Sequence, residues 1–122
     1  MIVDDEPDIT AVLKRALDQA GFKVDAFTDP REALASFAPG RYAMLITDIR
    51  MPGINGFELY RQVKKRDDKI KVAFMTAFEI YEDEFKIVLP SLSISCFFKK
   101  PVSTKQLVER VIQVLGEEFT MS

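Results

Sequence analysis

Short apolar or alternating runs occur along the chain between segments whose apolar residues recur every three or four positions. The runs occupy residues 2–3, 22–26, 43–46, 72–75 and 94–98. The periodic segments occupy residues 9–20, 30–37, 57–63, 80–88 and 107–115. Recurrence at three and four positions is typical of a helix with one buried face, and short apolar runs are typical of strands. The pattern therefore predicts five strands that alternate with five helices.

Several predicted helices also have local start or stop signals. Pro7 suits the first turn of the first helix, and Gly21 is expected to end that helix. Asp29 is expected to cap the second helix, and Ser103 or Thr104 the last one.

Strands that alternate with helices favour a parallel sheet with helices on both faces, joined by right-handed crossovers. The runs at 43–46 and 72–75 lack polar alternation, so we expect these strands at the centre of the sheet. The run at 22–26 alternates and is expected nearer an edge. In such sheets the functional crevice lies beyond the carboxyl ends of the strands.

The predicted strands end in residues that can carry chemistry. Asp4 and Asp5 follow the first strand, Asp48 the third, Thr76 the fourth and Lys100 the fifth. Two carboxylates ~4 Å apart repel by roughly 4 kcal/mol at an effective dielectric constant of 20, so a cluster of them favours a bound cation. Oxygen ligands alone favour Mg²⁺, with Mn²⁺ as an alternative. Together these residues indicate phosphoryl transfer, with Asp48 as the nucleophile and with Thr76 and Lys100 on the phosphoryl oxygens.

The composition of the chain excludes several classes of function. The chain has 122 residues and 48% hydrophobic residues, which is typical of one globular domain. It has no histidine, which excludes histidine-based catalysis and a role as a histidine phosphodonor, and one cysteine, which excludes an internal disulfide. The net charge of -2 gives no reason to expect direct nucleic-acid or membrane binding. With no apolar run long enough to cross a bilayer and no signal-peptide pattern, the cytoplasm is the expected location.

Four stretches in this order resemble the receiver domain of two-component response regulators, the CheY-like family. They are Val3-Asp4-Asp5-Glu6-Pro7, Asp48-Ile49-Arg50-Met51-Pro52-Gly53-Ile54-Asn55-Gly56, Met75-Thr76-Ala77 and Lys100-Pro101. The resemblance implies a flavodoxin-like α/β fold, a doubly wound (βα)5 unit whose five parallel strands have the order 2-1-3-4-5. It places the receiver domain at residues 1–116 and a C-terminal tail at 117–122.

The resemblance also implies a role for individual residues. Asp48 is the expected phosphoacceptor and also a metal ligand. Asp5 is expected to bind Mg²⁺ directly, Asp4 to support the ion from its outer shell, and the main-chain carbonyl of Arg50 to add a ligand. Thr76 and Phe97 form the expected switch pair, whose movement would change the surface of the fourth helix, fifth strand and fifth helix.

A receiver would take its phosphoryl group from a sensor histidine kinase or a phosphotransfer protein. It would pass the signal to a downstream protein, and a phosphorylation-dependent homodimer is a family-based alternative. No enzymatic turnover is expected beyond Mg²⁺-assisted self-phosphorylation and autodephosphorylation, and no organic cofactor is expected.

Three features depart from the family pattern. Only three residues precede the acidic pair, which predicts weaker support for the metal site from the first strand. Residues 78–95 lack the usual small-residue pattern and carry Pro90 and several serines, so the output surface is expected to differ. Bulky Arg50 and Phe78 lie two residues beyond Asp48 and Thr76, where they would screen an acyl phosphate from water and slow its hydrolysis.

Each residue also has an alternative, purely structural interpretation. Asp4 and Asp5 can stabilise a helix N-terminus, and Asp48 can cap a turn. Thr76 can simply be a β-branched residue that ends a strand, and Lys100 a solvated charge. Phe97 can be an ordinary core side chain.

Three other functions compete with that of a phosphorylated receiver. A magnesium-dependent phosphohydrolase would commonly carry an acid two residues after its nucleophile, where this chain has Arg50. A flavodoxin-like cofactor binder would offer free N–H groups where this chain has three acidic residues. A phosphorylation-independent docking module, or pseudo-receiver, is the alternative that the residues leave open.

Overall fold

The computed structural model describes residues 1–77 and 96–120. Within them, five parallel strands form one sheet in the order β2-β1-β3-β4-β5. The strands are β1 (Ile2–Val3), β2 (Ala26–Phe27), β3 (Met44–Asp48), β4 (Lys71–Thr76) and β5 (Cys96–Lys99). The helices are α1 (Pro7–Gln19), α2 (Pro30–Ser36), α3 (Gly56–Arg66) and α5 (Thr104–Thr120). The predicted strand order and the central positions of β3 and β4 are confirmed.

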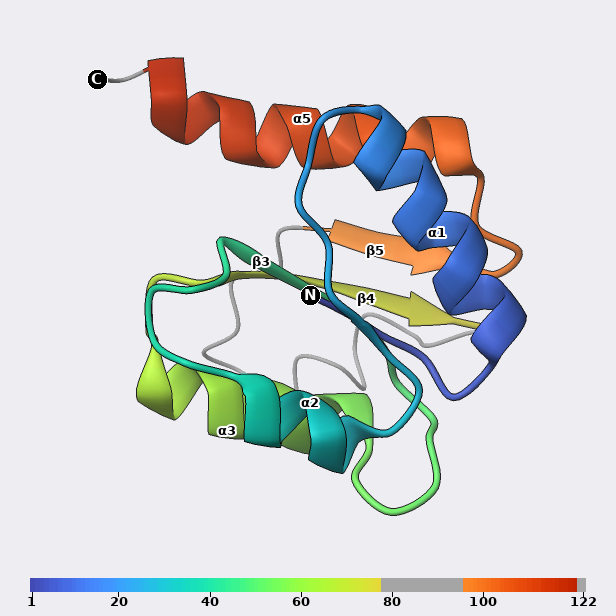
Figure 1. The fold of residues 1–122 in the computed structure, drawn as a ribbon, viewed down its shortest axis with the longest axis vertical. Helices are drawn as coiled ribbons and strands as arrows, with labels where there is room; N and C mark the ends of the chain where they lie inside the picture. Colours follow the sequence, from blue (N-terminus) through green and yellow to red (C-terminus); the bar gives the residue numbers. More distant parts are fainter. Residues whose placement is uncertain (78–95, 121–122) are drawn as a thin grey trace.

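The helices cover both faces of the sheet (Figure 1). Helices α1 and α5 pack on one face, where Ile2, Ile46 and Met75 belong to the same apolar cluster as Leu13 and Leu107. Helices α2 and α3 cover the other face through a second cluster. Strand side chains alternate between the two covered faces, so β3 is buried along its whole length, as the apolar run that begins it predicts.

The predicted helix signals operate as expected. Pro7 and Pro30 occupy the first helical positions of α1 and α2. The Asp29 side chain accepts a hydrogen bond from the main-chain N–H of Arg31, at 2.9 Å. Ser103 Oγ accepts one from the N–H of Gln106, at 3.2 Å, so Ser103 caps α5. Gly21 follows α1 with a φ of 98°, a left-handed conformation that favours glycine.

The second strand is shorter than predicted. The alternating segment at 22–26 predicts a strand along its whole length, but β2 comprises only Ala26 and Phe27. The partner strand β1 is two residues long and pairs Ile2 with Ala26 and Val3 with Phe27. Pairing with β1 therefore covers only the end of the predicted segment and one residue beyond it.

Two other expectations concern the C-terminal part of the chain. Helix α5 runs to Thr120 and so includes residues 117–120, which the sequence assigned to the tail. The boundary at residue 116 stays a prediction. The predicted fourth helix at 80–88 and the atypical segment 78–95 lie outside the described residues. No helix in the described ranges is both long and apolar enough to cross a membrane.

Candidate functional site

The carboxyl ends of the strands bring three of the predicted residues into contact. Lys100 Nζ lies 2.7 Å from Asp4 Oδ2 and 3.1 Å from Asp48 Oδ2. Asp4 is fully buried at the end of β1, and Asp48 ends β3 with only 6% of its surface exposed. The Lys100 side chain is itself only 9% exposed. A buried cation thus joins two buried carboxylates from neighbouring strands.

The two carboxylate oxygens of Asp4 have different partners. Oδ1 accepts a hydrogen bond from the main-chain N–H of Glu6, at 2.9 Å. Oδ2 has the Lys100 ammonium as its charge partner, but among the described residues it has no hydrogen bond of acceptable geometry. Oδ2 therefore faces a cation, while Oδ1 holds the main chain of Glu6.

Asp5 and Glu6 follow Asp4 in the chain, and the three carboxylates form an acidic group that reaches the surface. Carboxylate oxygens of Asp4, Asp5 and Glu6 all lie within 4.8 Å of one another, and the last two side chains are exposed. Glu6 Oε1 also lies 3.6 Å from Lys100 Nζ. The sequence reasoning did not include Glu6 in the site, although its position directly after the acidic pair was an available signal. The donor set of oxygen ligands fits Mg²⁺.

The electrostatics of Asp48 and Lys100 are coupled. Burial raises the pKa of Asp48 above its ordinary value, and the charge of Asp4 adds to this effect, while the hydrogen bond from Lys100 opposes it. Burial lowers the pKa of Lys100, but its bonds to Asp4 and Asp48 outweigh burial and leave the pKa raised. Lys100 therefore holds its proton more firmly than an isolated lysine, whereas ionisation of Asp48 costs more free energy than that of an exposed aspartate.

The loop after β3 is held close to Asp48. The main-chain N–H of Ile49 donates to Asp48 Oδ1 at 2.8 Å, and the N–H of Gly56 donates to the carbonyl oxygen of Ile49 at 2.7 Å. A Cβ on Gly56 would overlap the main-chain oxygen of Asp48. The start of α3 can therefore approach the end of β3 only because residue 56 is glycine, a requirement that the sequence reasoning missed. Arg50 lies in this loop with an exposed side chain.

Thr76 is hydrogen-bonded through its main chain to Lys100, but it does not lie opposite Phe97 in the pairing of β4 with β5. Thr76 ends β4 with 6% exposure, and its carbonyl oxygen accepts the main-chain N–H of Lys100 at 2.8 Å. In the β4–β5 ladder, Thr76 is opposite Lys99, whereas Phe97 is opposite Phe74. The rings of Phe97 and Phe74 lie 5.8 Å apart, and Phe97 is half-buried against the cluster under α2 and α3.

The chain is similar in sequence to known regulatory proteins. A family model described as the response regulator receiver domain matches residues 1–112. The chain is 32% identical to the transcriptional regulatory protein TrcR of Mycobacterium tuberculosis, over 91% of this chain and 42% of that protein. It is 32% identical to the regulatory protein VanRB of Enterococcus faecalis, over 94% of this chain and 51% of that protein. The chain thus spans about half of these relatives or less.

Solved structures give the same fold. A CheY-like response regulator receiver domain protein from Methanospirillum hungatei matches 99% of this chain and 95% of its own, with a TM-score of 0.86 and 24% identity. The chemotaxis protein CheY4 of Vibrio cholerae matches 93% of this chain and 94% of its own, with a TM-score of 0.80 and 25% identity.

Proposed function

Because the chain belongs to the family of response regulator receiver domains, we propose that it accepts a phosphoryl group on Asp48 and changes conformation in response. Receiver domains are signalling phosphoacceptors rather than conventional enzymes. The observation that carries the proposal is the contact of Lys100 with both Asp48 and Asp4 at the carboxyl ends of the strands.

The proposed reaction is an in-line transfer to a carboxylate. A bond forms between an Asp48 carboxylate oxygen and phosphorus, while the bond from phosphorus to the donor's imidazole nitrogen breaks. These 122 residues contain no histidine, so the phosphohistidine must lie outside them, in a sensor kinase or a phosphotransfer protein. Lys100 pairs with Asp48 in this structure, and its ammonium would donate a charge-assisted hydrogen bond to a phosphoryl oxygen after the transfer.

We place the Mg²⁺ site between the acidic group and the end of β3 that carries Asp48. Asp5, Asp48 and the Arg50 main-chain carbonyl would hold the ion, and Asp4 would support it from the outer shell; Glu6 is near enough to contribute. When bound, Mg²⁺ supplies positive charge that offsets the charge of the phosphoryl oxygens. The hard oxygen donors of Asp4, Asp5 and Glu6, which lie within 4.8 Å of one another, support this assignment.

Thr76 and Phe97 are the proposed switch pair. The buried Thr76 hydroxyl would hydrogen-bond the phosphoryl group, and the half-buried Phe97 ring would move further inward. This conformational change would carry the signal to a downstream protein or to a second copy of the chain. We place these interactions in the cytoplasm, together with the phosphohistidine donor.

Intact-protein mass after incubation with acetyl phosphate tests the proposal. We expect a gain of one phosphoryl group that requires Mg²⁺ and disappears in Asp48→Ala. Asp68→Ala is a matched control, because this exposed aspartate lies far from the acidic group in the loop after α3. A labelled Asp48→Ala would refute Asp48 as the acceptor. An unlabelled but folded wild type would favour the docking module instead.

A further inference from the structure

The Thr47 hydroxyl donates a hydrogen bond to the main-chain carbonyl oxygen of Asp48, at 2.9 Å. Thr47 is fully buried in β3, directly before the residue proposed as the phosphoacceptor. A buried hydroxyl without a partner is costly, so this side chain must bond to a group within its reach. The partner it takes is the main chain of the acceptor residue itself.

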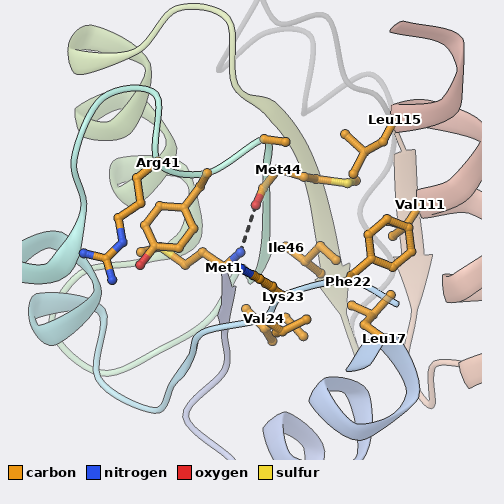
Figure 2. Close-up of a pocket in the computed structure, with 13 residues that line it drawn as sticks. Met1, Leu17, Phe22, Lys23, Val24, Arg41, Met44, Ile46, Val111 and Leu115 are labelled. Atoms are coloured by element: carbon orange, nitrogen blue, oxygen red, sulfur yellow. Dashed lines mark hydrogen bonds between the residues drawn. The ribbon is translucent and has the colours of Figure 1, made fainter. Parts of the chain in front are cut away.

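The carbonyl group of Asp48 lies just beyond the end of β1. Every second residue of β3 turns its main-chain N–H and C=O towards β1. Near the start of β3, the Met1 nitrogen donates to the carbonyl oxygen of Met44 at 3.0 Å, a bond drawn in Figure 2. Asp48 belongs to the same series, but β1 ends at Val3, which lies opposite Thr47. No residue of β1 therefore lies opposite Asp48, and the Thr47 hydroxyl donates to its carbonyl instead.

The peptide group that joins Asp48 to Ile49 is held at both ends. The Thr47 hydroxyl bonds its oxygen, and the start of α3 packs so closely on the same oxygen that a Cβ on Gly56 would overlap it. At the other end, the Ile49 N–H donates to the carbonyl oxygen of Met75 at 3.1 Å and to Asp48 Oδ1 at 2.8 Å. A rotation of this peptide group would therefore disturb the bond to the Asp48 carboxylate.

The two carboxylate oxygens of Asp48 differ in what holds them. Oδ1 is bonded to the Ile49 N–H, which stays in place while the peptide group is fixed. Oδ2 is bonded to the Lys100 ammonium, at the end of a flexible side chain that can follow a phosphoryl oxygen. A donor on the carbonyl of a peptide polarises that peptide and strengthens its N–H as a donor. The Thr47 hydroxyl therefore strengthens the bond to Oδ1 and leaves Oδ2 as the oxygen that can attack phosphorus.

We propose that Thr47 is a positioning residue for phosphoryl transfer: through the peptide group between Asp48 and Ile49, it holds Oδ1 in place and directs Oδ2 at the phosphoryl donor. This inference rests on the proposed function of Asp48. In the transfer, Oδ2 forms a bond to phosphorus as the bond from phosphorus to the donor's imidazole nitrogen breaks. The imidazole keeps the electron pair of the broken bond and takes up a proton. Thr47 is fully buried and acts only through the main chain.

Amide hydrogen exchange of the ¹⁵N-labelled 122-residue chain tests the positioning without any phosphorylation. Thr47→Val removes the hydroxyl and keeps a β-branched side chain of similar size. We expect the Ile49 amide to exchange roughly fivefold faster in this variant, relative to the amide of Ala73, which is buried and paired on both sides in β4. Thr47→Ser keeps a hydroxyl and should restore the wild-type ratio.

Thr10→Val is the matched control. Thr10 is also a buried threonine, and its hydroxyl also donates to a main-chain carbonyl oxygen, that of Pro7, at 2.8 Å. It belongs to α1, which covers the opposite face of the sheet from α3. The loss of this hydroxyl should leave the exchange ratio of the Ile49 and Ala73 amides unchanged, because it does not touch the peptide group after Asp48.

The rate of labelling by acetyl phosphate in the presence of Mg²⁺ completes the test. It should fall roughly tenfold in Thr47→Val, because Oδ2 is no longer held in line with the donor. It should return close to the wild-type rate in Thr47→Ser and stay unchanged in Thr10→Val. If Thr47→Val does not fold, Thr47→Ala removes the same hydroxyl and takes its place.

Two results would overturn the inference while the proposed function stands. One is an exchange ratio of the Ile49 and Ala73 amides that does not change in Thr47→Val. The other is a labelled wild type whose rate is matched by Thr47→Val, or a Thr47→Ser variant that is as slow as Thr47→Val. A wild type that gains no phosphoryl group would instead refute the proposed function, and with it the role given to Oδ2.

Discussion

Lys100 Nζ lies 3.1 Å from Asp48 Oδ2, although the two residues are 52 positions apart in the chain. The same nitrogen lies 2.7 Å from Asp4 Oδ2. One ammonium thus compensates two carboxylates that are buried at the ends of adjacent strands. Removing the ammonium leaves both carboxylates without compensation.

Lys100→Met is expected to lower the free energy of unfolding by about 3–5 kcal/mol, because two buried carboxylates lose their cation. Mg²⁺ should restore part of this loss, because the ion can supply positive charge to the same carboxylates. Urea denaturation with and without MgCl₂ measures both effects.

Lys105→Met is the control for this substitution. Lys105 is exposed in the first turn of α5, so its loss should change the free energy of unfolding by less than about 0.5 kcal/mol and should not alter the Mg²⁺ response. A Lys100→Met variant that is as stable as the wild type, or that Mg²⁺ does not stabilise more than it stabilises the Lys105 variant, would contradict the prediction.

Asp48→Asn is expected to raise the melting temperature at pH 7. Burial raises the pKa of Asp48 above its ordinary value of 3.8, so the folded state binds the proton more tightly than the unfolded state. Ionised Asp48 therefore destabilises the fold above the folded-state pKa, and this cost disappears as the pH falls below 3.8. Lys100 keeps Asp4 as a partner in the variant.

Melting curves followed by circular dichroism at pH 7 and at pH 3 measure this difference. The advantage of Asp48→Asn should be present at pH 7 and absent at pH 3. A lower melting temperature than the wild type at pH 7 would show that the Lys100 bond, rather than burial, dominates the electrostatics of Asp48.

Gly56→Ala is expected to destabilise the domain by about 1–3 kcal/mol, because the new Cβ would overlap the main-chain oxygen of Asp48. It should also slow phosphorylation, because the loop after β3 must move to make room. Gly116→Ala is the matched control: this helical glycine has open space around its Cβ position, so alanine should stabilise by roughly 0.5–1 kcal/mol. Equal effects of the two substitutions on stability and labelling would argue against the contact.

Replacing both Arg50 and Phe78 with alanine is expected to speed loss of the phosphoryl group. The exposed Arg50 side chain leaves the loop two residues after Asp48, where it can screen an acyl phosphate from water. The chemistry predicts faster hydrolysis when this screen is removed, and decay of the phosphorylated mass over time measures it. An unchanged decay rate in the double variant would rule out screening by these side chains.

The sequence alone determined the features that depend on neighbouring residues. Helical periodicity, the caps at Asp29 and Ser103, and the apolar run that begins β3 are local signals, and the structure has each of them. The parallel direction of the strands followed from the alternation of strand and helix, and their order from the resemblance to receiver domains. Because parallel strands end at one edge of a sheet, the meeting of Asp4, Asp48 and Lys100 could also be predicted.

Only the tertiary structure decided what depends on register and close approach. It placed β2 at Ala26–Phe27, where the main chain pairs with β1, one residue beyond the end of the predicted segment. It brought Glu6 within reach of Lys100, set Phe97 opposite Phe74 rather than Thr76, and required glycine at position 56. These contacts join residues distant in sequence, and shifts of a few ångströms in packing make or break them, so no local pattern along the chain encodes them.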